Sequence, residues 1–143
     1  MATDVQMSVT LTPVGEPWVS VRAPGFNKCS RLLKTTKFDI EFLSNCDCET
    51  LEIEHRAKST HDATTAVIVD SIDFFGIQDP RFAWQGVYYP VYPEPWFSQQ
   101  VCTPAAALPA QTYLGWNGIY QLRFGVPVFT WIHQVQNLGW IYQ

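Results

Sequence analysis

Charge is scarce in this sequence, and the scarcity is uneven. Charged residues make up 15% of the 143 positions, against about 25% in an average soluble domain. From Phe75 to Gln143 there are 16 aromatic residues but only four charged ones. An exposed surface ordinarily carries many more charges than that. We therefore expect some of these rings to fill the core and the others to face a partner protein, a sugar or another copy of the chain.

Basic residues are also few, with nine Lys and Arg against 13 Asp and Glu and a net charge of −4. A protein that binds nucleic acid ordinarily shows a clustered basic patch, so we expect no nucleic-acid partner. Uninterrupted apolar runs such as Ala105–Leu108 are far shorter than the roughly 20 residues of a membrane span. Met1–Asp4 has no basic region and no apolar stretch, so we expect no secretory signal and synthesis in the cytoplasm.

Cysteine and histidine are too sparse to indicate a metal scaffold. The four cysteines are Cys29, Cys46, Cys48 and Cys102. Cys46 and Cys48 form a Cys-x-Cys pair, whereas zinc and redox motifs use Cys-x-x-Cys. In a cytoplasmic product these thiols are expected to be reduced. The sequence thus predicts no metal site and no resident cofactor, with calcium as an open alternative discussed below.

Alternating apolar and polar residues predict a succession of short strands. The predicted strands are Val5–Leu11, Trp18–Arg22, Lys37–Phe42, Thr50–Arg56, Thr65–Val69, Gly86–Tyr89 and Gly118–Val126. Prolines at positions 80, 90, 93, 95, 104 and 109 indicate a long ordered excursion, because proline is confined to turns, edges and bulges. Val128, Trp131 and Val135 fit a short helix, although a strand fits nearly as well.

These elements predict one all-β domain over residues 1–143. The expected architecture is a β-sandwich of jelly-roll type, with long aromatic and Pro-rich loops and at most one short C-terminal helix.

Four carboxylates, those of Asp39, Glu41, Glu52 and Glu54, lie on the polar sides of two neighbouring predicted strands. If these strands form a hairpin with Glu41 opposite Glu52, like charges crowd together and favour a cation such as Ca²⁺. A register shifted by two residues sets Asp39 against Arg56 instead. We interpret the four carboxylates as a solvated face and keep calcium as a possibility.

The sequence predicts no catalytic residue. His55 falls on the inward side of a strand and is expected to be a buried, hydrogen-bonded histidine. His61 and Asp62 could act as base and orienter, but they lie in a polar loop, with no nucleophile at a motif spacing. We interpret them as turn residues, and the protein as a non-enzyme.

The segment Tyr88–Phe97 interleaves rings with prolines and gives a stiff surface that suits protein interfaces and sugar faces. Three interpretations stay open: a loop over its own core, a partner contact, and a carbohydrate platform. The binding candidates are Tyr88, Tyr89, Tyr92, Trp96, Phe97, Trp116, Trp131, Trp140 and Tyr142.

Two stretches, Thr50–Glu54 and Ala66–Phe74, resemble the core of calcium-dependent carbohydrate-binding β-sandwiches of the xylan-binding type. In that family a strand of leucine, charge and isoleucine is followed by one of valine, aspartate, any residue and isoleucine. The resemblance implies a glycan-binding module, and it assigns no calcium or sugar ligand to this sequence.

Three other stretches are similar to small virion-associated proteins of tailed phages that infect marine cyanobacteria. They are Tyr89–Trp96, Leu114–Gly118 and Pro127–Trp131. This resemblance implies a structural component of the virion, made in the host cytoplasm, whose partners are other virion proteins or copies of itself. We therefore expect an assembly role first, with docking through Tyr88–Phe97 and Trp131–Tyr142. The alternative is glycan binding, with or without calcium.

Overall fold

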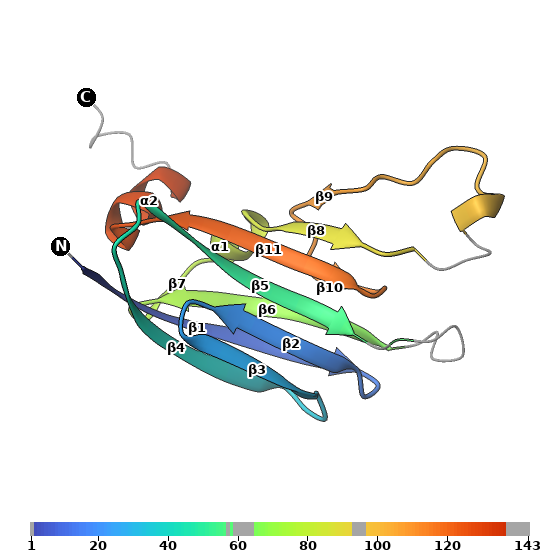
Figure 1. Cartoon of the computed structure of the whole chain (residues 1–143), viewed down its shortest axis with the longest axis horizontal. Coiled ribbons are helices and arrows are strands. Elements are labelled where there is room, and N and C mark those ends of the chain that lie inside the picture. The colour runs from blue at the N-terminus through green and yellow to red at the C-terminus, as the bar shows by residue number, and fades with distance from the viewer. Residues whose placement is uncertain (1, 57, 59–64, 93–96, 137–143) are drawn as a thin grey trace.

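The structure, a computed structural model, describes residues 2–56, 58, 65–92 and 97–136 (Figure 1). Its strands form two antiparallel sheets. In sheet A the strand order is β10–β6–β1–β4, and β7 pairs with β6. The bounds in sheet A are β1 Thr3–Val14, β4 Thr36–Ser44, β6 Ala66–Phe74, β7 Ile77–Gln78 and β10 Tyr113–Leu114.

Sheet B has the strand order β3–β2–β5–β11–β8–β9. The bounds are β2 Trp18–Ala23, β3 Phe26–Arg31, β5 Cys48–Arg56, β8 Val87–Pro90, β9 Leu108–Pro109 and β11 Gly118–Gly125. Two short helices, α1 (Pro80–Trp84) and α2 (Val128–Val135), and a 3-10 turn (Phe97–Gln99) complete the described elements. Neither helix is long and apolar enough to cross a bilayer.

The β-sandwich and the short C-terminal helix predicted from the sequence are confirmed. Pro127 lies just before the first turn of α2, a place where its fixed φ and missing N–H cost nothing. The second helix, α1, is not apparent from apolar periodicity because it has only five residues. It begins instead at a polar cap, where the Asp79 carboxylate accepts from the Arg81 N–H at 2.9 Å.

The predicted hairpin of the strands around Phe38 and Ile53 is wrong. β4 pairs with β1 in sheet A, whereas β5 pairs with β2 and β11 in sheet B. Residues 45–47 therefore carry the chain from one sheet to the other. Alternation shows that each strand buries one face, but a hairpin and a crossing between facing sheets bury the same residues.

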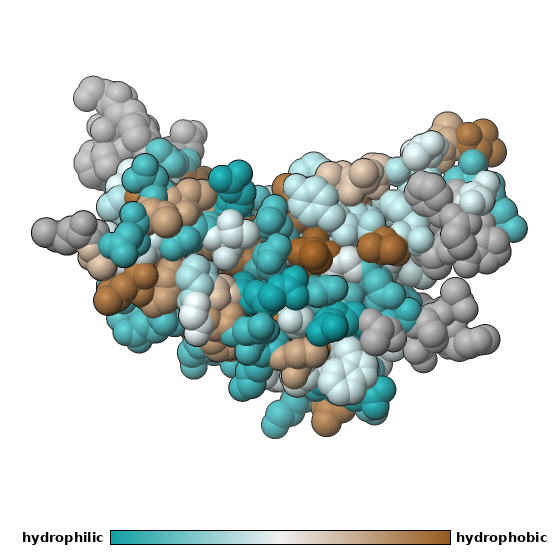
Figure 2. All heavy atoms as spheres, in the orientation of Figure 1, coloured by the Kyte–Doolittle hydropathy of each residue, from teal (hydrophilic) through white to brown (hydrophobic). Residues whose placement is uncertain are grey.

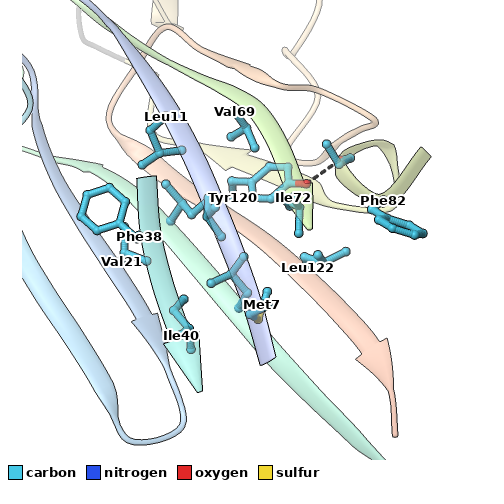
Figure 3. Packing of buried hydrophobic residues seen from close by; sticks show 14 of the residues in the cluster. Met7, Leu11, Val21, Phe38, Ile40, Val69, Ile72, Phe82, Tyr120 and Leu122 are labelled. Atoms are coloured by element: carbon cyan, nitrogen blue, oxygen red, sulfur yellow. Dashed lines mark hydrogen bonds between the residues drawn. The ribbon is translucent and has the colours of Figure 1, made fainter. Parts of the chain in front are cut away.

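The inward residues of both sheets form one continuous core (Figure 3). Met7 and Ile40 face each other across β1 and β4, and Tyr120 and Ile53 across β11 and β5. Tyr120 is fully buried, and its hydroxyl donates to the Ala83 carbonyl of α1. That bond satisfies the one polar atom that this ring brings into the core.

The sandwich has two unlike ends. At the end on the left of Figure 1, α2 lies across the sheets. There the Trp131 ring lies 5.2 Å from that of Phe74, 5.5 Å from that of Phe82 and 6.2 Å from that of Phe124. We call these four rings the ring cluster and this end the closed end. At the opposite end are the β1–β2 turn, the last residues of β5 and the first of β6, and the excursion between β8 and β9 (Figure 1).

Candidate functional site

The second end of the sandwich, which we call the open end, carries a cleft of about 330 Å³. We call it the aromatic cleft. It is lined by Lys58, Thr65, Tyr88, Tyr92, Leu108, Gln111, Tyr113, Gly115 and Trp116. Its four rings come from β8, the excursion after it, β10 and the turn before β11. Residues distant in sequence therefore meet at one hollow.

Tyr88 anchors the cleft from inside the sandwich. The side chain is 2% exposed, and its hydroxyl donates to the Trp116 carbonyl and accepts from the Trp116 N–H at 3.1 Å. Burial raises the pKa of Tyr88 to about 12, so the hydroxyl keeps its proton at neutral pH. The turn that carries Trp116 is thereby fixed to β8.

Lys58 closes the cleft on the other side. Its ammonium nitrogen lies 4.6 Å from the centroid of the Trp116 ring, a cation–π distance, and donates to the Thr65 carbonyl at 2.9 Å. The Asn117 side chain accepts from the Lys58 N–H and donates to its carbonyl, both at 2.8 Å. The end of β5 is thus bonded to the turn before β11.

Gly118 permits this arrangement because the backbone of β8 passes very close to it. A Cβ at this position would lie 2.4 Å from the Tyr89 carbonyl oxygen and 2.7 Å from the Pro90 Cα. Glycine is the residue expected at such an approach. The Asn117–Gly118 pair suggests a tight hairpin in the sequence, but here it connects β10 of sheet A to β11 of sheet B.

A second hollow of about 340 Å³ adjoins the aromatic cleft, since Lys58 and Thr65 line both. We call it the basic pocket. Its lining is Glu16, Pro17, Trp18, Arg31, His55, Arg56, Lys58 and Thr65. His55 is fully buried, with its Nδ1 2.8 Å from the Leu114 carbonyl. Burial lowers the pKa of His55, so the ring is neutral at pH 7, and the carbonyl, which only accepts, places the proton on Nδ1.

A third hollow, of about 440 Å³, lies on the outer face of sheet B. Ile119 stands between Tyr89 of β8 and Glu54 of β5 in the strand register, and all three line this hollow. Figure 2 shows one whole face of the molecule, on which hydrophilic residues predominate and apolar ones lie scattered. The lining of the third hollow mixes apolar residues such as Val91 and Ile119 with polar ones such as Glu52 and Gln121.

The predicted binding candidates separate into groups. Tyr88, Tyr92 and Trp116 meet in the aromatic cleft, whereas Tyr89, 44% exposed, lies on the outer face of sheet B. Trp131 packs within the ring cluster and lines none of the three hollows, so the structure places it apart from the other candidate rings. A helical ring facing the core gives the same sequence signal as one facing a partner.

The remaining candidates are not placed. Trp96, Trp140 and Tyr142 lie outside the described residues, as do His61 and Asp62, and the structure describes the backbone of Phe97 but not its side chain.

The cluster of four carboxylates does not form. Asp39 and Glu41 are exposed on β4 of sheet A, whereas Glu52 and Glu54 belong to β5 of sheet B. The two glutamates lie beside Arg22, which is 3.5 Å from Glu52 and 2.9 Å from Glu54. The cause of the error is the hairpin that was assumed for the two strands.

Within the described part of the chain no three His, Cys, Asp or Glu side chains come together as a metal site would require. The acidic side chains of the described residues therefore do not form a calcium site by themselves, whereas calcium also binds backbone carbonyl, amide and water oxygens.

The predicted binding candidates did not include Tyr113, Trp18 or the three basic residues of the open end, Arg31, Arg56 and Lys58. Arg56 ends a predicted strand, and Lys58 and Arg31 lie outside all of the predicted strands. The ends of β3 and β5 lie at the same end of the sandwich because both strands run antiparallel to β2. Predicting this requires the strand order, which the sequence does not provide.

Two solved structures match this fold. One is described as vCBM60 in complex with galactobiose; it is 19% identical, with a TM-score of 0.51, and the match covers 84% of this chain and 97% of that one. The other is the selenomethionine form of vCBM60, described in connection with a circular permutation that links two families of calcium-dependent carbohydrate-binding modules. It is 16% identical, with a TM-score of 0.53, over 84% of this chain and 90% of that one.

No protein-family model matches the sequence, and no curated protein matches it. At these identities the two structures establish a shared β-sandwich fold. The structural neighbours of the chain are carbohydrate-binding modules.

Proposed function

We propose that this chain is a non-catalytic carbohydrate-binding module and that the aromatic cleft is its binding site. The observation that carries the proposal is the convergence of Tyr88, Tyr92, Tyr113 and Trp116 on one hollow. Sugars offer apolar C–H faces and polar hydroxyls, and Tyr and Trp side chains offer an apolar body with a polar tip. A volume near 330 Å³ lies within the usual range of small-ligand sites.

The cleft also offers hydrogen-bonding groups at its rim. The Tyr92 hydroxyl donates to the Ala105 carbonyl at 2.7 Å and the Gln111 amide donates to the Tyr113 carbonyl at 2.8 Å. These bonds hold the rim in place before a ligand arrives, which lowers the ordering cost of binding. The described lining contains no carboxylate, whereas glycoside hydrolysis ordinarily uses a pair, so we propose binding without chemistry.

The fold supports the same proposal, because one structural neighbour is described as a complex with galactobiose. The virion-assembly role and virion location predicted from the sequence find no support among the comparisons, so glycan binding takes first place. One neighbour is linked to calcium-dependent families. Among the described residues no cluster of His, Cys, Asp or Glu side chains marks a metal site, so an EDTA arm in the assay measures any calcium contribution.

Calorimetric titration with galactobiose, longer neutral galactan oligosaccharides and acidic galactan oligosaccharides tests the proposal. We expect measurable binding, and a loss of about 10-fold or more in Trp116→Ala and Tyr92→Ala, as for aromatic contact residues in general. The matched control is Trp84→Ala, because Trp84 is 54% exposed and belongs to α1, outside the cleft. Failure of every oligosaccharide to bind, or equal losses in Trp84→Ala and Trp116→Ala, would reject the cleft as a glycan site.

A further inference from the structure

The basic pocket gathers an unusual share of the positive charge of the chain. Arg31, Arg56 and Lys58 line it, and they are three of only nine Lys and Arg residues in a chain of net charge −4. Among the lining residues one carboxylate, that of the exposed Glu16, opposes them. A hollow with this balance attracts anions in a molecule that otherwise repels them.

The two arginines are presented to solvent and are not used up in strong internal ion pairs. Both are exposed. The Arg31 guanidinium lies over the Trp18 ring at 5.5 Å from its centroid, which orients it without neutralising it. Arg56 donates to the Cys29 sulfur at 3.3 Å, and its Nε lies 4.0 Å from Glu54, too long for a strong charge-assisted hydrogen bond.

The floor of the pocket holds a second sign of an unfilled polar site. The His55 ring lines the pocket and is fully buried, and its Nε2 has no hydrogen-bond partner among the described residues. Because Nδ1 carries the proton, Nε2 is an acceptor. This acceptor is closed to solvent, so the groups that the pocket offers directly to a ligand are the guanidinium donors.

We propose that the basic pocket binds a negatively charged substituent, a carboxylate or a sulfate ester, of the same glycan whose rings occupy the aromatic cleft. The proposal rests on the proposed function and narrows it to acidic polysaccharides. Lys58 and Thr65 form a wall common to both hollows, so neighbouring residues of one oligosaccharide reach both. Arginine suits this role because its planar fork binds carboxylate and sulfate-like oxygens in pairs.

The test compares three ligands by calorimetry: a neutral galactan oligosaccharide, an oligogalacturonide that carries carboxylates, and a carrageenan oligosaccharide that carries sulfate esters. We expect at least one acidic ligand to bind about 10-fold or more tightly than the neutral one. This advantage should shrink between about 0.01 M and 1 M salt as the charges are screened. Comparison of the two acidic arms identifies which anion the pocket takes.

Arg31→Gln and Arg56→Gln each remove one positive charge from the pocket. The control is Arg123→Gln, which removes the same charge from an exposed position of β11 outside the pocket. We expect both pocket variants to lose the advantage of the acidic ligand and to bind the neutral ligand as before, with Arg123→Gln unchanged. Thermal unfolding of each variant verifies that it folds.

The outcomes are distinguishable. If the neutral ligand binds as tightly as both acidic ones, the glycan site stands and the anionic pocket is rejected. If an acidic ligand binds better but Arg123→Gln weakens it as much as Arg31→Gln does, the attraction is a property of the whole surface, and the pocket is again rejected. If no ligand binds, the proposed function itself fails.

Discussion

The two ends of the sandwich use the same kind of residue in opposite ways. At the closed end Phe74, Phe82, Phe124 and Trp131 turn inward and contact one another, and α2 lies over them. At the open end the rings stand around two hollows, with Lys58 beside Trp116. The aromatic C-terminal half of the chain, with only four charged residues, therefore does not need another molecule to cover all of its rings. Several of these rings are already covered by packing against other rings in the core.

The difference between the ends lies in the polar groups that accompany the rings. The closed end pairs several of its polar groups with one another, as where Asp79 accepts from Arg81 and from Gln136. The open end leaves Arg31 and Arg56 exposed and the His55 Nε2 without a partner in the described residues. Rings that stand next to unfilled polar positions indicate binding, whereas rings that contact only other rings indicate packing.

Replacement of the central ring of the closed end should have the largest effect. Trp131→Ala removes a side chain that contacts three other rings, and we expect the free energy of unfolding to fall by about 3–5 kcal/mol. Since a domain of this kind has only about 5–15 kcal/mol in total, the variant should unfold at a much lower temperature. Denaturant unfolding followed by circular dichroism measures the loss.

The counterpart at the open end is Trp116→Ala, which removes a partly buried ring. We expect a cost of about 1 kcal/mol, typical of a point substitution outside the core. Equal losses for the two variants would contradict the distinction between an end that packs and an end that binds.

The sequence allowed seven strands and their inward faces to be predicted, because alternation depends only on neighbouring residues, whereas β3, β7, β9 and β10 were not predicted. Phe38, Ile40, Leu51 and Ile53 are all buried as the pattern requires. The sandwich followed from the number of such strands. The pairing of the strands could not be predicted, since β4 and β5 bury the same residues whether they form a hairpin or face each other.

The site could be predicted only in part for the same reason. Tyr88, Tyr92 and Trp116 stand out as rings in turns and near prolines, and they meet in the cleft. Arg31 and Arg56 carry no local signal, and only the pairing of β2 with both β3 and β5 brings their strand ends together. Long-range pairing thus assembles both hollows, and only the rings of the aromatic cleft stand out in the sequence.

An effect smaller than that of Trp131→Ala is expected from removal of the Tyr88 hydroxyl. Tyr88→Phe keeps the ring in the core but removes the group that bonds both the N–H and the carbonyl of Trp116. Leaving partly buried polar groups unpaired costs about 1–3 kcal/mol. We expect a loss of this order in unfolding free energy, together with weaker glycan binding because the Trp116 turn is no longer fixed.

Tyr92→Phe is the matched control for this variant. It also removes one hydroxyl, which donates to the Ala105 carbonyl in an exposed setting. Its effect on stability should be small, about 0.5 kcal/mol or less. A Tyr88→Phe variant as stable as Tyr92→Phe would show that the hydroxyl does not hold the turn.

An effect that depends on pH is expected at the polar rim of the closed end. Asp79 caps α1, pairs with Arg81 at 2.7 Å and accepts from the Gln136 amide at 3.0 Å. The hydrogen bonds from Arg81 lower the pKa of Asp79 to about 2, against about 3.9 in an unfolded chain. Because the unfolded state binds the proton more readily, this contribution to stability is complete above pH 4 and disappears as the pH falls towards 2.

Asp79→Asn keeps a capping oxygen but carries no charge, so we expect a loss of about 1 kcal/mol at pH 7. That loss should fade as the pH falls from 4 to 2, and the melting temperatures of the two proteins should converge there. Gln136→Ala removes one donor from the same carboxylate and should give a smaller change of the same sign. A constant difference in melting temperature between Asp79→Asn and the wild type from pH 4 to pH 2 would contradict this. It would mean that Phe82 and its ring neighbours alone hold α1, and that charge does not stabilise the closed end.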